Sequence, residues 1–201
     1  MDDQVYAGRI DLLEFLSALL DGPPDERFVQ GLFAGEVAGP APSVNESLDR
    51  GFDLLATFHD DEAGSDPSAV AERVGAEYAS LFESGAVSTR ESAYREPDAD
   101  ADRELAAAYA AADWSAPDGH RDALGTELAF LRHLVARQRA GHAAALEQER
   151  AFVDEHLSRW VDPFARDLAE AADSTLYRGV AHLLRGVVEF EDALVTTQLL
   201  E

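Results

Sequence analysis

The 201-residue sequence contains no cysteine and no lysine. Without cysteine, the chain has no thiolate nucleophile, no disulfide and no cysteine-ligated zinc or iron–sulfur site. Without lysine, it has no Schiff-base residue and no P-loop lysine, which excludes pyridoxal chemistry and the standard mode of nucleotide hydrolysis. These two absences remove many classes of enzyme from consideration.

Long apolar runs are also missing, since no stretch approaches the ~18 residues needed to span a bilayer. The N-terminus, Met1-Asp2-Asp3, is acidic where a signal peptide would carry basic residues. We therefore expect a cytoplasmic protein with no stable membrane insertion.

Positive charge is scarce. The chain has 40 acidic and 16 basic residues, all of the latter arginine, and a formal net charge of -24. Such an excess of acid repels nucleic acid, so we expect no nucleic-acid partner. It is typical of proteins from halophiles, and at ~1 M salt the Debye length of about 3 Å removes long-range attraction. Specific binding should then depend on apolar contacts and close ion pairs.

The pattern of apolar residues is helical almost throughout, with the period of about 3.6 residues that an α-helix requires. No alternating strand pattern or hairpin signal stands out. The expected helices, about nine in number, span residues 3–20, 25–33, 43–59, 66–82, 98–112, 120–140, a segment around 152–160, 163–172 and 174–199. No repeat or linker divides the chain, which predicts an all-α fold with a single irregular bundle over residues 1–201.

Residues 83–97 form the longest stretch without a helical pattern, and an irregular segment of this length in a compact domain is more often functional than a short connector. No group of residues predicts catalysis. The six histidines include no pair with the spacing of a helical zinc site, and no serine lies in a Gly-x-Ser-x-Gly turn. We expect no catalytic residue, no metal and no cofactor.

Three stretches carry a more specific pattern. The first is Tyr-Ala-Ser-Leu-Phe at residues 78–82, followed after a loop by Ser-Ala-Tyr at 92–94. The second is Asp-Ala-Leu-Gly-Thr-Glu-Leu-Ala-Phe at 122–130. The third is Phe-Val-Asp-Glu-His-Leu-Ser-Arg-Trp at 152–160, with Phe164 after it. In this order they resemble the motifs of the TorD/DmsD/NarJ family of redox-enzyme maturation chaperones, although Ala123 stands where the family's second motif has histidine.

The resemblance implies an all-helical domain, either a monomer or a domain-swapped homodimer, that binds another protein and catalyses nothing. The implied partners are the twin-arginine signal peptide and the catalytic subunit of a molybdopterin-containing oxidoreductase, of the dimethyl sulfoxide, trimethylamine oxide or nitrate reductase type. The chaperone would hold the subunit until its cofactor is inserted and export is allowed. The sequence identifies neither the client nor a site for guanine nucleotide.

The resemblance also implies a set of leader-binding residues: Tyr78, Leu81, Phe82, Tyr94, Asp122, Glu127 and His120. The first three lie three or four residues apart at a helix end, as an apolar contact for a helical peptide requires. The two acids suit short-range pairing with the arginines of the leader. Core packing for Leu81 and Phe82, and a bond from Glu127 to a neighbouring helix, are the competing interpretations.

The third stretch is expected to be mainly structural. A large aromatic side chain buries much area, and a histidine that points inward needs a hydrogen-bond partner. The residues concerned are Phe152, His156, Leu157, Trp160 and Phe164.

Two other classes of protein share parts of this pattern. A helical adaptor or regulatory module would show the same apolar stripes but would have no need of the long loop after Phe82. A carboxylate-bridged di-metal enzyme would need Glu-x-x-His repeats, which are missing. The chaperone interpretation therefore comes first and the adaptor second.

Overall fold

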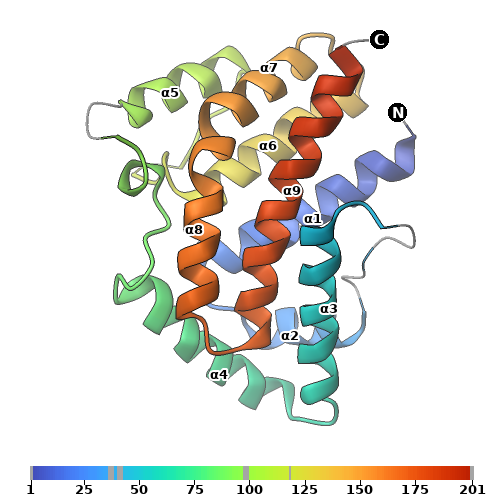
Figure 1. Ribbon diagram of the computed structural model, residues 1–201, viewed down its shortest axis with the longest axis vertical. Coiled ribbons are helices and arrows are strands. Elements are labelled where there is room, and N and C mark those ends of the chain that lie inside the picture. Colours follow the sequence, from blue (N-terminus) through green and yellow to red (C-terminus); the bar gives the residue numbers. More distant parts are fainter. Residues whose placement is uncertain (1, 36–38, 40–42, 97–99, 118, 200–201) are drawn as a thin grey trace. The chain divides into compact units, whose positions relative to one another are not determined.

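The computed structural model describes residues 2–35, 39, 43–96, 100–117 and 119–199 (Figure 1). Across these residues the chain is all-α, as predicted, and its one β-type pairing is an isolated bridge between Arg90 and Ala123. The α-helices are α1 (Asp3–Asp21), α2 (Glu26–Phe33), α3 (Glu46–Asp61), α4 (Pro67–Tyr78), α5 (Ala101–Ala111), α6 (Leu124–Arg139), α7 (Ala145–Phe152), α8 (Ser158–Ala171) and α9 (Thr175–Leu199). Three short turns join them: the π-helical turns η1 (Ala79–Glu83) and η3 (Val153–Leu157), and the 3₁₀ turn η2 (Glu91–Ala93).

Side-chain caps explain where several helices begin. A carboxylate or amide oxygen accepts a backbone N–H two or three residues further on at each of four N-termini, those capped by Asp25, Asn45, Asp66 and Asp100. The predicted helix start at residue 43 was wrong, because α3 begins at Glu46. Asn45 stands directly before α3, so its Oδ1 reaches the N–H of Leu48 at 2.8 Å, while the Ser43 hydroxyl bonds Asp49 at 2.5 Å.

The predicted helix start at Pro163 was also wrong, because Pro163 lies inside α8. A proline within a helix removes one hydrogen bond, to the carbonyl four residues earlier. Here that carbonyl belongs to the exposed Arg159, and Pro163 is itself only partly buried. Water can therefore replace the missing donor, and the helix continues through the proline.

Contacts between Cα atoms divide the chain into two compact units. The first unit comprises the described parts of residues 1–21, 89–160 and 191–201, and the second comprises the described parts of 22–88 and 161–190. The single-domain organisation expected from the sequence stays a prediction.

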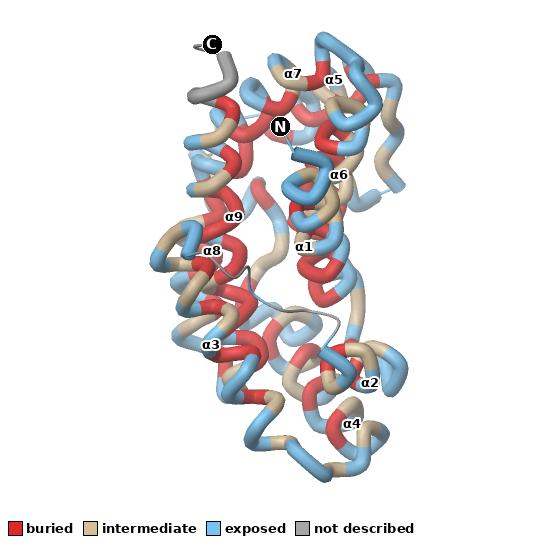
Figure 2. The backbone as a smooth tube through the Cα atoms, turned by 90° about the vertical axis from the view of Figure 1, so that its right-hand side faces the viewer, coloured by how far each residue is buried: buried red, intermediate tan, exposed pale blue. Residues whose placement is uncertain are grey.

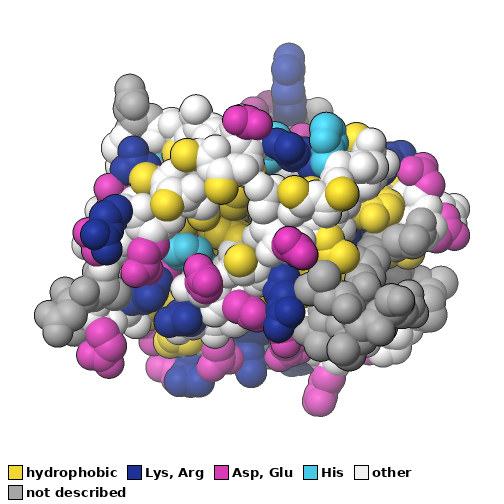
Figure 3. Space-filling model, turned by 90° about the horizontal axis from the view of Figure 1, so that it is seen from above, with side chains coloured by type: hydrophobic (Ala, Val, Ile, Leu, Met, Phe, Trp, Pro, Cys, Tyr) yellow, Lys and Arg dark blue, Asp and Glu magenta, His cyan; other side chains and the backbone are white. Residues whose placement is uncertain are grey.

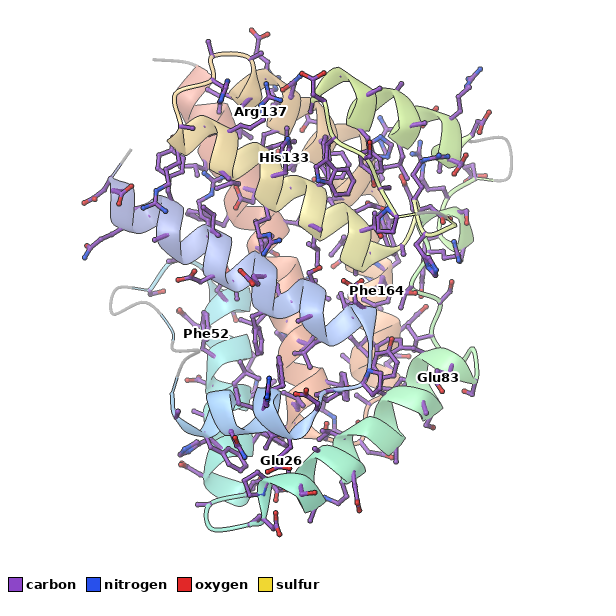
Figure 4. The ribbon with its side chains drawn as sticks, turned by 180° about the vertical axis from the view of Figure 1, so that it is seen from behind. Glu26, Phe52, Glu83, His133, Arg137 and Phe164 are labelled. Atoms are coloured by element: carbon purple, nitrogen blue, oxygen red, sulfur yellow. The ribbon has the colours of Figure 1, made fainter. Side chains whose placement is uncertain are left out.

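In the first unit α1 packs along α6, as Figure 4 shows from behind. The hydroxyl of Ser17 in α1 donates to the carbonyl of Gly125 in α6 at 2.9 Å. Aromatic rings fill the core beside these helices: the centroid of Phe130 lies 4.6 Å from Tyr109 and 4.8 Å from Phe152. Edge-to-face packing of this kind adds to the area that the rings bury.

In the second unit α3 packs against the part of α9 that belongs to this unit, with glycines at the contact.

Buried positions recur between exposed ones around α1 and α3 (Figure 2), which is the amphipathic pattern that the sequence predicted. Figure 3 shows a face on which acidic and arginine side chains are mixed. Arg139 and Asp3 form one surface ion pair of the first unit, at 2.7 Å.

A buried polar network links four helices of the first unit. Arg9 of α1 donates from Nη2 to Glu149 of α7 at 2.7 Å and from Nε to Glu191 of α9 at 3.0 Å, and Gln138 of α6 also donates to Glu149. One guanidinium therefore faces two carboxylates. Burial first, and then the charge of Glu191, raise the pKa of Glu149 to about 8 despite the nearby Arg9.

This raised pKa makes stability depend on pH. The folded chain keeps the Glu149 proton up to about pH 8, whereas an ordinary glutamate releases it near pH 4.5. Because the folded state binds more protons in this window, the free energy of unfolding should fall as pH rises through it, by at most about 1.4 kcal/mol per pH unit. Urea unfolding at a series of pH values should show a flatter slope for Glu149→Gln.

The matched control for this prediction is Glu147→Gln, since Glu147 is exposed on the same helix. It makes the same chemical change on the same helix and should leave the slope of the wild-type chain in place. Equal slopes for Glu149→Gln and the wild-type chain would show that Glu149 does not hold the proton.

Candidate functional site

Stretches far apart in the sequence meet around one buried glutamate of the first unit. Glu91, in η2, is fully buried, and both its carboxylate oxygens lie 3.0 Å from Nδ1 of His156 in η3. Arg95, four residues further on, donates to the same carboxylate at 2.7 Å and to Glu104 of α5 at 3.2 Å. A buried charge requires such partners, because desolvation alone would be prohibitive. We call the following residues the polar cluster: Glu91, Arg95, Asp122, Glu127, His156 and Trp160.

Backbone hydrogen bonds hold the loop that carries Glu91 against the start of α6. The N–H of Glu91 donates to the carbonyl of Asp122 at 2.9 Å, and the N–H of Leu124 donates to the carbonyl of Thr89 at 2.8 Å. The stretch predicted to be irregular, residues 83–97, thus contains a 3₁₀ turn and a bridge, while its last residue lies outside the described residues. This anchoring presents the side chains of the loop in defined positions.

Asp122 lies just before α6 and accepts two side-chain hydrogen bonds. Ser92 donates to its Oδ2 at 2.7 Å, and Arg90 donates from Nη1 to its Oδ1 at 2.5 Å. Burial raises the pKa of Asp122, but the bonds from Ser92 and Arg90 outweigh it and hold that pKa below its ordinary value. The polar cluster therefore contains a carboxylate that stays ionised at neutral pH.

Within the polar cluster, Glu127 is paired with the indole of Trp160. The indole N–H of Trp160 donates to Oε2 of Glu127 at 3.2 Å, and both side chains are fully buried. Burial, together with the charge of Glu91, raises the pKa of Glu127 well above its ordinary value, and its Oε1 has no hydrogen-bond partner within the described part of the chain. Tyr94 stacks on Trp160 with centroids 5.7 Å apart. Glu127 thus orients the indole on which Tyr94 rests.

In the second unit the first stretch leaves α4 through the π-helical turn η1, which ends at Glu83 (Figure 4). Tyr78 packs edge-on against Phe82 at 5.0 Å, and Phe82 packs against Tyr177 of α9 at 5.9 Å. Tyr78 and Leu81 are buried, whereas Phe82 is only partly buried. Both π-helical turns fall within stretches that carry the resemblance, and such turns often mark functional sites.

The predicted binding residues are divided between the two units. The first unit holds Tyr94, Asp122, Glu127 and His120, of which the first three lie in or beside the polar cluster and His120 is exposed. The second unit holds Tyr78, Leu81 and Phe82. All five residues expected to be structural are buried: Phe152, His156, Leu157, Trp160 and Phe164.

The sequence did not identify three residues of this site: Glu91, Arg90 and Arg95. Glu91 was one acid among 40, and it lies 65 positions from His156, so no local pattern joins the two. The available signal was indirect. An inward His156 requires a partner, and the spacing of four between Glu91 and Arg95 indicates one turn of ordered chain inside a stretch that otherwise looks irregular.

The chemistry of the polar cluster suits recognition. It offers an ionised carboxylate at Asp122, and the partly exposed ring of Tyr94 stacks on its Trp160. In the described ranges, no three histidine, aspartate or glutamate side chains are grouped so that they could hold a metal ion. No helix in those ranges is both long and apolar enough to cross a membrane.

Comparison with known families gives the class of protein, a chaperone of molybdoenzyme maturation. The model of the nitrate reductase delta subunit family matches residues 42–166, which include all three stretches, and the chain belongs to that family. The family's partner is a molybdoenzyme subunit. No curated protein and no solved structure matches the chain.

Proposed function

We propose that this chain is a cytoplasmic chaperone that binds the twin-arginine leader and the apo-form of a molybdopterin-containing catalytic subunit, of the dimethyl sulfoxide, trimethylamine oxide or nitrate reductase type. It aids cofactor insertion and delays export until insertion is complete. The observation that carries the proposal is the meeting, within the first unit, of residues 91–94 with the second and third motif stretches at the polar cluster, where Ser92 bonds Asp122, Glu91 bonds His156 and Tyr94 stacks on Trp160.

Within the first unit, the leader's arginine binds at Asp122. The carboxylate of Asp122 stays ionised and lies at the edge of the polar cluster, with 12% of the Asp122 side chain exposed. It can therefore accept a charge-assisted hydrogen bond from the arginine. The partly exposed Tyr94 and the exposed His120 provide further contacts for the leader. Glu127 has no access to solvent, so its part is to orient Trp160 beneath Tyr94.

Within the second unit, the apolar part of the leader binds at Phe82. This ring is partly exposed, while Tyr78, which packs edge-on against it, and Leu81 are buried. A rigid aromatic ring that is already packed on one side loses little conformational entropy when a ligand covers the other. Tyr78 and Leu81 therefore support the contact rather than make it.

Peptide binding tests the proposal directly. The purified chain is titrated into a fluorescein-labelled peptide that carries two adjacent arginines before an apolar stretch, and anisotropy is read at low and high salt. The controls are the same peptide with both arginines changed to glutamine, and the same peptide with its apolar residues changed to serine. The native peptide should bind more tightly than either control. Absence of binding, or equal binding of all three peptides, would overturn the proposal.

Phe82→Ala should weaken binding of the native peptide by about tenfold, the usual loss when an aromatic anchor of an interface is truncated. The matched control is Phe28→Ala, which removes a partly buried ring from α2 in the same unit. Thermal unfolding of both variants separates loss of fold from loss of contact. Equal losses of affinity in the two variants would show that Phe82 has no special part in binding.

A further inference from the structure

We propose that Arg90 occupies, in the free protein, the place that an arginine of the leader takes in the complex. The chain would then carry an internal substitute for its own ligand, and binding would be an exchange of one guanidinium for another at Asp122. This inference rests on the proposed function, since it concerns the same leader.

The geometry of the Asp122 carboxylate supports the exchange. Its Oδ2 accepts from Ser92 at 2.7 Å and its Oδ1 accepts from Arg90 at 2.5 Å, so each oxygen already has a donor. Arg90 also donates from Nη2 to the carbonyl of Gly119 at 3.3 Å. A guanidinium from a ligand can bond Oδ1 in the same way only after Arg90 has moved aside.

Comparison of the two arginines on this loop shows which one can move. Arg95 has 11% of its side chain exposed and bonds Glu91, Glu104 and the carbonyl of Glu155. Arg90 has 45% of its side chain exposed, so solvent reaches its ion pair with Asp122 more readily than the ion pairs of Arg95. An ion pair with one well-hydrated partner contributes little net stability, so releasing Arg90 costs far less than releasing Arg95.

The exchange has a consequence for salt dependence. When one guanidinium replaces another, the number of ion pairs at Asp122 does not change, so this contact contributes little net electrostatic attraction. Without Arg90 the carboxylate would be uncovered, and an incoming arginine would form a new pair. Removing Arg90 should therefore make binding both tighter and more sensitive to salt.

The test uses the full chain and the labelled twin-arginine peptide. At low salt Arg90→Gln should bind the peptide about threefold to tenfold more tightly than the wild-type chain, as expected for loss of a competing ion pair of this exposure. Arg90→Lys keeps the positive charge but lacks the planar guanidinium, so its affinity for the peptide should lie between those of the wild-type chain and Arg90→Gln. Arg121→Gln is the matched control: Arg121 is 41% exposed and pairs with Asp102, so the change in net charge is the same while Asp122 stays covered.

A double-mutant cycle with Asp122→Asn assigns the gain to this carboxylate. The gain from Arg90→Gln should disappear when Asp122 is already asparagine. An equal gain in Arg121→Gln, a gain that persists in the double variant, or no gain at all in a folded Arg90→Gln would overturn the inference and leave the proposed function standing. If neither the wild-type chain nor Arg90→Gln binds the peptide, the proposed function itself fails.

Discussion

Glu91→Ala should lower the free energy of unfolding by about 3–5 kcal/mol, the usual cost of removing one partner of a buried ion pair. Glu91 is fully buried, and its carboxylate accepts from Arg95 at 2.7 Å and lies 3.0 Å from Nδ1 of His156. Removal of the carboxylate leaves both partners in the interior with one acceptor fewer. It also releases the loop that presents Tyr94. Urea unfolding measures the loss without adding salt.

Glu104→Ala is the control for this result, because Glu104 bonds the same Arg95 but has 44% of its side chain exposed. It should cost about 1 kcal/mol or less, the range for exposed pairs. The contrast separates the effect of burial from the effect of losing any acid near Arg95. Similar losses in the two variants would mean that Glu91 is not the central charge of the polar cluster.

The parts of the fold that depend on local sequence were predictable. Periodic apolar residues place α1 and α9 almost at their observed ends, and Asp25 and Asp66 mark the starts of two more helices. The errors occurred where two local signals compete. Proline at 163 reads as a helix start, yet its position on a partly exposed side of α8 lets the helix pass through it.

The candidate site was predictable only in part, for a physical reason. The three motif stretches were identified from residue type and spacing, but the partners that organise them lie far apart in the chain. Glu91 and His156 are 65 residues apart, and Arg90 and Asp122 are 32 apart. In a chain with 40 acids, no single acid is distinguished until the fold shows which ones are buried and bonded. The resemblance to a known family identified the three motif stretches, and the structure showed which of their residues pair with distant partners.

Gly186→Ala should lower the free energy of unfolding by about 2–3 kcal/mol, although alanine favours a helix interior by about 1 kcal/mol over glycine. A Cβ at this position of α9 would lie 2.5 Å from the backbone nitrogen of Leu48 and 3.0 Å from Oδ1 of Asn45. Backbone cannot swing away as a side chain can, so the two helices must separate. Separation would also break the bond from Asn45 Nδ2 to the carbonyl of Gly186, at 2.8 Å, and disturb the cap of α3.

Gly75→Ala in α4 is the control with the opposite sign. Among the residues that the structure describes, a Cβ there would meet only Pro23 of the same unit, at an ordinary 3.7 Å. The helical preference of alanine then acts unopposed and should raise the free energy of unfolding by about 0.5–1 kcal/mol. Urea unfolding of both variants compares the same substitution at a crowded and an open position. If Gly186→Ala were as stable as Gly75→Ala, close packing of α3 on α9 would not be what requires glycine at 186.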